Sequence, residues 1–282
     1  MKVANINENA CIVLNENRAW RIAEESQGRF GPHMPDIFLQ WPEFIDWAGT
    51  HQPGETFCFT EDELGPVSPA PGQIFAVGLN YDEHAQETGL AVNVEFPPVF
   101  PKWASSLAKP WGTLAVPDSD SHIDWEVELV AIIGREGKNI PRHEAMHYLA
   151  GFTVGQDFSD RQVQFAGETP QWGLAKSFAG FSPIGPWLIT PDELTNGKAQ
   201  ISCAVNGIIK QCGTLDQMIF SVPDIIAIIS GIVTLKPGDI IFTGTPSGVG
   251  FAREPAEYLQ PGQVVVSTIE GIGALRQRVV AR

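Results

Sequence analysis

Basic residues are scarce in this sequence. Its 282 residues include 18 lysines and arginines against 33 aspartates and glutamates, which gives a formal net charge of −15. Because no run of Lys or Arg interrupts this acidity, the composition argues against binding to nucleic acid or to an anionic membrane through a basic patch. An acidic surface would also repel an anionic substrate, so a site for such a substrate needs cations of its own.

Cysteine motifs and long apolar segments are also absent. The four cysteines form no CxxC pair, which is typical of reduced thiols in a cytoplasmic protein. Residues 1–8 lack the apolar core of a signal peptide. The longest apolar run, residues 225–235, is too short to span a bilayer. These features predict a cytoplasmic protein with no membrane partner.

No nucleotide-binding or zinc-binding motif is present either. The glycine-rich turn at residues 243–250 follows a strand-like segment but lacks the GK[ST] ending of a P-loop, and no GxGxxG precedes a helix. Histidines and cysteines are not clustered as zinc ligands would be. Backbone N–H groups in the 243–250 turn could still hold a carboxylate.

Strand-like segments dominate from residue 73 onward. They are 73–77, 113–116, 125–133, 151–154, 187–190, 199–205, 239–243 and 263–269. Gly, Pro and Asn turns separate them, which argues against a doubly wound α/β fold and predicts a mostly-β domain with short helices. One helix should begin at Ser221, with Asp224 at capping-box spacing, and another should span residues 142–149.

The first seventy residues differ in character from the rest. They are irregular and acidic, with aromatic-rich patches, and they end in the turn-rich connector at residues 65–72. We therefore expect a small, variable α+β domain over residues 1–71 and a larger domain over residues 72–282.

The most informative segment is an acidic strand over residues 124–134. Side chains two positions apart on a strand share a face. One face carries Trp125, Val127, Leu129, Ala131 and Ile133, and the other carries Asp124, Glu126, Glu128, Val130 and Ile132. The second face is typical of a strand that runs out of a core into a cleft, where a cation relieves the repulsion between carboxylates. The competing interpretation is a solvated strand end with three exposed acids.

A further acid, Asp157, follows another strand-like run. It should lie at a strand end, where loops present functional groups. Together, Glu126, Glu128 and Asp157 would offer carboxylates from two strands to Mg²⁺, with Mn²⁺ or Ca²⁺ as alternatives. Taken alone, such an aspartate is more often a turn or cap residue.

A pair of residues and a single lysine could also take part in catalysis. His84 and Glu87 would share a face of a short helix, where the carboxylate would raise the basicity of the imidazole so that it could deprotonate water. Lys176, bracketed by apolar and small residues, could hold a substrate carboxylate or enolate oxygen. The simpler interpretations are a solvated helical turn and a surface lysine with a buried stem.

In combination these segments resemble the fumarylacetoacetate hydrolase superfamily, which contains acylpyruvases and fumarylpyruvate hydrolases. The resemblance runs from about Gly72 to the C-terminus, and its landmarks occur in the family's order. They are residues 78–81 with His84 and Glu87, 97–102, 126–129, Asp157 with Arg161 and Gln164, 176–178, 185–186, 206–207, 234–239 and 243–246.

The resemblance implies a mixed β-sandwich roll, usually a homodimer, that holds a divalent cation through Glu126, Glu128 and Asp157. It also implies that residues 72–282 form the catalytic domain, in which His84 and Glu87 activate a water. The positions implied to contact the substrate are Tyr81, Arg161, Gln164, Lys176 and Thr245, with Lys176 also catalytic.

The implied reaction is hydrolysis of a C–C bond in a β-diketone 2-oxo acid of the acylpyruvate or fumarylpyruvate type, including 2,4-dioxo sugar acids. Oxaloacetate decarboxylation, or isomerisation or hydration of a 2-oxo-dienoate, is the alternative, because all these reactions pass through a metal-stabilised enolate. The complete pair of His84 and Glu87 favours hydrolysis, since decarboxylation needs no activated water. A non-catalytic binding protein is the remaining alternative, disfavoured because no expected ligand is missing.

Overall fold

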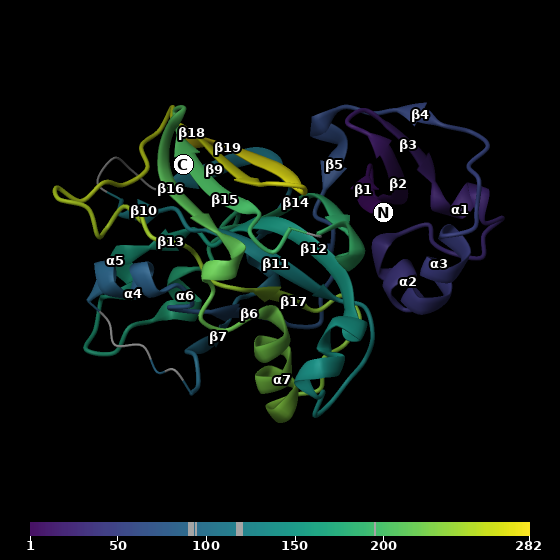
Figure 1. Cartoon of the computed structure of the whole chain (residues 1–282). Coiled ribbons are helices and arrows are strands. Elements are labelled where there is room, and N and C mark those ends of the chain that lie inside the picture. The colour runs from purple at the N-terminus through teal and green to yellow at the C-terminus, as the bar shows by residue number, and fades with distance from the viewer. Residues whose placement is uncertain (90–92, 94, 117–120, 195) are drawn as a thin grey trace.

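Two large β-sheets organise the chain (Figure 1). The structure is a computed structural model that describes residues 1–282 except 90–92, 94, 117–120 and 195. The main path of the larger sheet has the strand order β4-β3-β2-β1-β14-β12-β11-β17-β6-β7, with β5 paired to β1 and β8 to β14. The second sheet has the order β16-β15-β18-β19-β9, and β10 and β13 form a separate pair.

The larger sheet contains β1 (Lys2–Ile6), β2 (Asn9–Asn15), β3 (Arg18–Arg21), β4 (Phe57–Cys58), β5 (Leu64–Gly65), β6 (Ile74–Val77), β7 (Val99–Pro101), β8 (Leu107–Ala108), β11 (Val127–Ile133), β12 (Leu149–Gln156), β14 (Ser182–Ile189) and β17 (Ile240–Phe242). The remaining strands are β9 (Trp111–Val116), β10 (Ile123–Asp124), β13 (Ser159–Asp160), β15 (Gln200–Val205), β16 (Ile208–Thr214), β18 (Val264–Ile269) and β19 (Gly273–Ala281).

Helices are short and lie outside the sheets. The α-helices are α1 (Ile22–Glu25), α2 (Met34–Phe38), α3 (Trp41–Ala48), α4 (Asp82–Thr88), α5 (Arg161–Gln164), α6 (Trp172–Ala175) and α7 (Val222–Ile232), and the 3₁₀ helices are η1 (Glu61–Glu63), η2 (Ala104–Ser106), η3 (Arg142–Tyr148), η4 (Pro191–Glu193) and η5 (Leu215–Gln217). Helices α1–α3 lie at one end of the molecule and α4–α6 at the other (Figure 1). No helix of the described residues is long and apolar enough to cross a membrane.

The predicted mostly-β fold is confirmed, and all eight predicted strands coincide with observed ones. The helix opened by Ser221 is α7, and its capping box with Asp224 is present. The segment predicted as a helix over 142–149 is the 3₁₀ helix η3. Strand β19 was not predicted because its alternate residues are exposed and two of them, Arg276 and Arg278, are charged.

The central strand β11 separates two hydrophobic cores. Its first predicted face packs with apolar residues of the second sheet, such as Ile201 and Val265. On the opposite face, Val130 and Ile132 pack in a core that includes Phe44 of helix α3. Both faces of β11 are therefore buried, which fixes the depth of the acidic residues at its start.

The N-terminal segment extends the larger sheet. Strand β1 pairs antiparallel with β14, with Lys2 opposite Ile189 and Val3 opposite Leu188. Strands β1–β3 are followed by helices α1–α3 and then by strands β4 and β5, so strands and helices are segregated, as in an α+β arrangement. The boundary at residue 71 stays a prediction.

Glycine at position 151 allows β12 and β14 to approach closely. A Cβ atom there would lie 1.9 Å from the carbonyl oxygen of Ile189. We expect Gly151→Ala to lower the free energy of unfolding by about 3 kcal/mol, because the β12–β14 pairing would have to shift. The matched control is Gly231→Ala in α7, where a Cβ meets nothing within 4 Å and helix propensity should add about 0.5 kcal/mol. Thermal denaturation compares the two, and equal melting temperatures would contradict this account.

Candidate functional site

Three acidic side chains converge where β11 begins and β12 ends. Glu128 lies in β11 opposite Gly155 of β12, and the backbone N–H of Asp157 donates to the carbonyl of Glu126 at 2.9 Å. One carboxylate oxygen from each of Glu126, Glu128 and Asp157 lies within 4.8 Å of the others. All three residues are buried, with 6%, 2% and 0% of their surface exposed. The alternative of a solvated strand end is therefore wrong.

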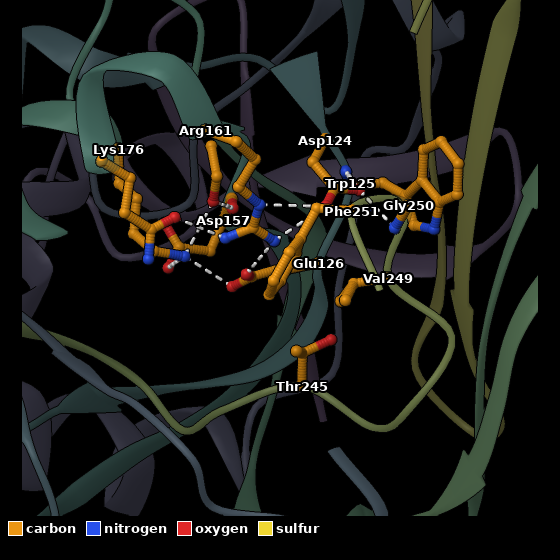
Figure 2. A network of polar contacts seen from close by, with 12 residues as sticks. Asp124, Trp125, Glu126, Asp157, Arg161, Lys176, Thr245, Val249, Gly250 and Phe251 are labelled. Carbon is orange, nitrogen blue, oxygen red and sulfur yellow. Dashed lines mark hydrogen bonds and ion pairs between the residues drawn. The ribbon is translucent and has the colours of Figure 1, made fainter. Parts of the chain in front are cut away.

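Three cations share this buried space with the acids. Lys176 Nζ lies 2.5 Å from Glu126 Oε2, and Arg161 Nη2 donates to Glu126 Oε1 at 2.6 Å. Lys102 Nζ donates to Asp157 Oδ1 and to the carbonyl of Lys176. Figure 2 shows Lys176 and Arg161 converging on Glu126 and Asp157 from short segments that follow the strands. These are the local cations that an anion site on an acidic protein requires.

The buried charged groups shift one another's pKa values strongly. Burial raises the pKa of Glu128 well above its usual range, and the nearby carboxylates of Asp157 and Glu126 raise it further. Burial would also raise the pKa of Glu126, but Lys176 and Arg161 outweigh it and lower that pKa to about 2. Burial lowers the pKa of Lys102, although Asp157 opposes the shift. The Glu128 carboxyl therefore lacks a compensating cation among the described residues.

The donor set fits a hard divalent cation. All three candidate ligands are carboxylates, and their spacing suits oxygens around one Mg²⁺, Mn²⁺ or Ca²⁺ ion. Asp157 Oδ2 accepts no hydrogen bond from the described residues; Lys176 Nζ lies 2.8 Å away but off the direction that a hydrogen bond needs. The Glu128 carboxyl forms no ion pair with the described residues, so it is the least compensated of the three candidate ligands.

The two residues predicted as a catalytic pair do meet on helix α4. His84 Nδ1 lies 2.8 Å from Glu87 Oε1, and His84 is only 6% exposed. Backbone N–H groups of Gly248 and Val249 donate to the Glu87 carboxylate at 2.8 and 3.5 Å. Because a carboxylate only accepts, His84 Nδ1 is the donor of this bond, which leaves Nε2 as a potential base. The alternative of a solvated helical turn is wrong.

A narrow pocket connects this pair with the acids. The lining includes His84, Glu126, Glu128, Asp157, Arg161, Gln164, Lys176 and Thr245, together with apolar walls that include Phe100, Phe165, Trp172 and Phe251. The space open to water is about 30 Å³. Of the ten predicted site residues, eight line this pocket; Glu87 lies behind His84, and Tyr81 is buried outside the lining.

The hydrogen bonds of three predicted substrate contacts are informative. Gln164 Oε1 accepts from Arg161 at 2.7 Å, so the two side chains act together. The Thr245 hydroxyl donates to the carbonyl of Val127 at 2.8 Å, so its proton is committed to the protein. The hydroxyl of Tyr81 is buried without a partner among the described residues, and burial raises its pKa, helped by Glu128.

One residue of the site was missed. Lys102 was recognised only as part of a family landmark, yet its fully buried ammonium group contacts Asp157. The available signal was a lysine at the end of an apolar, proline-rich segment in a chain with few lysines. Conversely, Asp124 shares the acidic face but does not join the three metal-ligand candidates.

Comparison with known proteins supports the resemblance. A sequence model of the family described as fumarylacetoacetate (FAA) hydrolase C-terminal matches residues 73–280. The human mitochondrial protein named oxaloacetate tautomerase FAHD2A is 42% identical over 218 residues, covering 77% of this chain and 69% of that protein.

Solved structures agree over the whole chain. A crystal structure of a Mycobacterium smegmatis protein provisionally named HpcE has 43% sequence identity and a TM-score of 0.94, covering 100% of this chain and 99% of that one. A 5-carboxymethyl-2-hydroxymuconate delta-isomerase from the same organism has 26% identity and a TM-score of 0.76, with 100% and 99% coverage. The fold is thus shared with these proteins.

The raised pKa of Glu128 predicts how cation binding depends on pH. A ligand carboxyl must lose its proton to bind a cation, so affinity for Mg²⁺ or Mn²⁺ should keep rising as pH increases beyond the ordinary titration range of a glutamate, with proton release on binding. Calorimetric titration in two buffers of different ionisation enthalpy measures both quantities. An affinity that does not change with pH across this range would contradict the perturbation of Glu128.

Proposed function

Because the chain belongs to the fumarylacetoacetate hydrolase family, we propose that it is a divalent-cation-dependent enzyme that enolises a small 2-oxo acid, with oxaloacetate as the first substrate to test. The main observation that supports this proposal is that the imidazole of His84 faces the same pocket as Glu126, Glu128 and Asp157. An acid–base group and a cation site in one pocket are the two requirements for proton transfer beside a carbonyl. Named relatives include a tautomerase and an isomerase, whose reactions are both of this kind.

The three carboxylates would hold the cation, which supplies polarisation of the 2-oxo carbonyl and stabilises negative charge on its oxygen. His84 Nε2 takes the proton from the carbon next to that carbonyl, and Glu87 stabilises the imidazolium that forms. Returning a proton to carbon or to oxygen gives the keto or the enol form. The reaction therefore needs no water as a reactant.

The cations of the pocket suit a dianionic substrate. Arg161 and Lys176 line the pocket and already bind carboxylates of the protein. A substrate carboxylate would replace part of this pairing, with the planar guanidinium of Arg161 able to bind it in two places. Lys176 would offset negative charge as the enolate forms. The narrow lining favours a compact acid over one with a long acyl chain.

The second candidate is hydrolysis of a C–C bond in an acylpyruvate or fumarylpyruvate. The observation in its favour is the bond between His84 and Glu87, an arrangement that can take a proton from water as well as from carbon. The name of the matching family describes a hydrolase. Oxaloacetate decarboxylation uses the same enolate. The cytoplasmic location and the homodimer stay predictions.

The two proposed reactions, enolisation and hydrolysis, differ in their substrates and in whether water is consumed. With Mg²⁺ or Mn²⁺, the wild-type protein should accelerate the loss of enol absorbance of freshly dissolved oxaloacetate, without releasing pyruvate at the same rate. Acetylpyruvate, assayed in parallel, should react more slowly by at least about ten-fold. Faster cleavage of acetylpyruvate would favour the hydrolase. The Glu126→Gln variant, which loses one ligand oxygen, serves as the inactive control.

Replacement of His84 separates acid–base chemistry from cation binding. We expect His84→Ala to lower kcat for oxaloacetate enolisation by about 10² to 10⁴-fold, the usual contribution of a positioned base, while Mn²⁺ affinity measured by calorimetry stays near that of the wild type. His84→Gln, which keeps a polar side chain, is the matched control for loss of volume. Wild-type turnover in both variants would show that another group moves the proton.

A further inference from the structure

The glycine-rich turn after β17 donates its backbone N–H groups to carboxylates of the protein itself. Gly244 donates to Glu128 Oε2 at 2.7 Å, and Gly248 donates to Glu87 Oε2 at 2.8 Å. Gly250 and Phe251 donate to the two oxygens of Asp124 at 2.7 and 3.0 Å. One continuous segment thus holds a cation-ligand candidate, the partner of the proposed base, and a third acid with no assigned role.

That third acid, Asp124, is completely buried. Besides the turn, its Oδ1 accepts from the backbone N–H of Trp125 at 2.8 Å, and its Oδ2 accepts from Arg161 Nε at 2.9 Å. Figure 2 shows Asp124 between the guanidinium of Arg161 and the backbone at Gly250 and Phe251. Its carboxylate therefore connects the guanidinium of Arg161, which faces the pocket, with the turn that holds the His84–Glu87 pair.

We propose that Asp124 is a positioning residue: it sets the guanidinium of Arg161 and fixes the part of the turn at residues 248–251, so that Arg161 and the His84–Glu87 pair keep one geometry. This inference rests on the proposed function. Asp124 does not line the pocket, and it acts through Arg161 on one side and through Gly250 and Phe251 on the other.

The donors around Asp124 explain why an aspartate is needed. Each of its oxygens accepts two hydrogen bonds, and every neighbour that binds it is an N–H donor. An asparagine has the same shape but offers one oxygen and one NH₂ group. Its NH₂ would face either the N–H groups of Trp125 and Gly250 or those of Arg161 and Phe251, and would repel them.

Three other contacts also orient Arg161, and one of them comes from the turn that Asp124 holds. Arg161 Nη2 donates to Glu126, which is also a candidate ligand of the cation, and its Nη1 donates to Gln164. The Phe251 ring, carried by the same turn, lies 4.4 Å from the guanidinium carbon. Without Asp124, both the Nε contact and the position of this ring would be lost together.

The variant that tests the proposal is Asp124→Asn, with Asp239→Asn as the matched control. Asp239 is equally buried and accepts from Gln73 N, Gln73 Nε2 and Lys236 N at 2.9, 2.7 and 2.8 Å, but it does not line the pocket. Both variants lose a buried charge. Only Asp124→Asn should disturb Arg161 and the His84–Glu87 pair.

We expect Asp124→Asn to raise KM for oxaloacetate by about ten-fold or more and to lower kcat as well, because a charge-assisted bond to Arg161 is lost. Mn²⁺ affinity, measured without substrate, should stay within about two-fold of wild type. Asp239→Asn should lower the melting temperature but leave KM and kcat within about two-fold. Equal effects of the two variants on KM would overturn the proposal.

A binding probe separates this inference from the proposed function. Oxalate, a planar dianion that resembles the enolate of a 2-oxo acid, is titrated calorimetrically in the presence of Mg²⁺. If the wild type neither binds oxalate nor turns over oxaloacetate, the proposed function fails. If it binds oxalate and Asp124→Asn binds it equally well, the positioning role fails.

A second variant covers the case in which Asp124→Asn does not fold. Asp124→Glu keeps an acceptor-only carboxylate and moves it by one methylene, so the charge remains while Arg161 is displaced. A KM raised by about three-fold or more, with unchanged Mn²⁺ affinity, supports the proposal. Wild-type KM and kcat in Asp124→Glu would contradict it.

Discussion

Mutual compensation of buried charges is the constraint on which this site depends. Among the described residues, the carboxylates of Asp124, Glu126, Glu128 and Asp157 meet the cations of Lys102, Lys176 and Arg161 in the same buried space. Desolvating any one of these groups alone would cost several kcal/mol, so each persists only because the others surround it. The excess of one carboxylate over the cations leaves the cluster with a place for an added positive charge.

The sheet makes this concentration of charge possible. Antiparallel pairing of β11 with β12 brings Glu128 beside Gly155, so that Glu126 and Asp157 lie next to each other although thirty-one positions apart in sequence. Both strands are buried on both faces, which denies the acids any route to solvent through rotation of the strand. The turn at residues 244–251 has glycines where the backbone must approach closely. Its N–H groups donate hydrogen bonds to carboxylate oxygens of Glu128, Glu87 and Asp124.

Local patterns predicted part of this arrangement, and long-range contacts decided the rest. The alternation of residues 124–134 identified the acidic face, and the spacing of His84 and Glu87 predicted that they meet on one helical turn, because both depend only on strand and helix periods. Lys102 reaches Asp157 across fifty-five positions, and Asp124 meets Gly250 across one hundred and twenty-six. No period in the sequence encodes such pairs, so Lys102 and the role of Asp124 became visible only in three dimensions.

The same geometry explains how related proteins can be named for tautomerisation, isomerisation or hydrolysis. All three reactions need stabilised negative charge on a substrate oxygen, and under the proposed function the carboxylate cluster with its cations would provide for that step in each of them. With His84 as the proposed base, the outcome would depend on the group that Nε2 faces: a carbon-bound proton would lead to enolisation, whereas a water would lead to hydrolysis. In this chain the space beside His84 is narrow and walled by aromatic side chains. Under the proposed function, a compact substrate that filled that space would leave no place for a reacting water, and the base would then act on carbon.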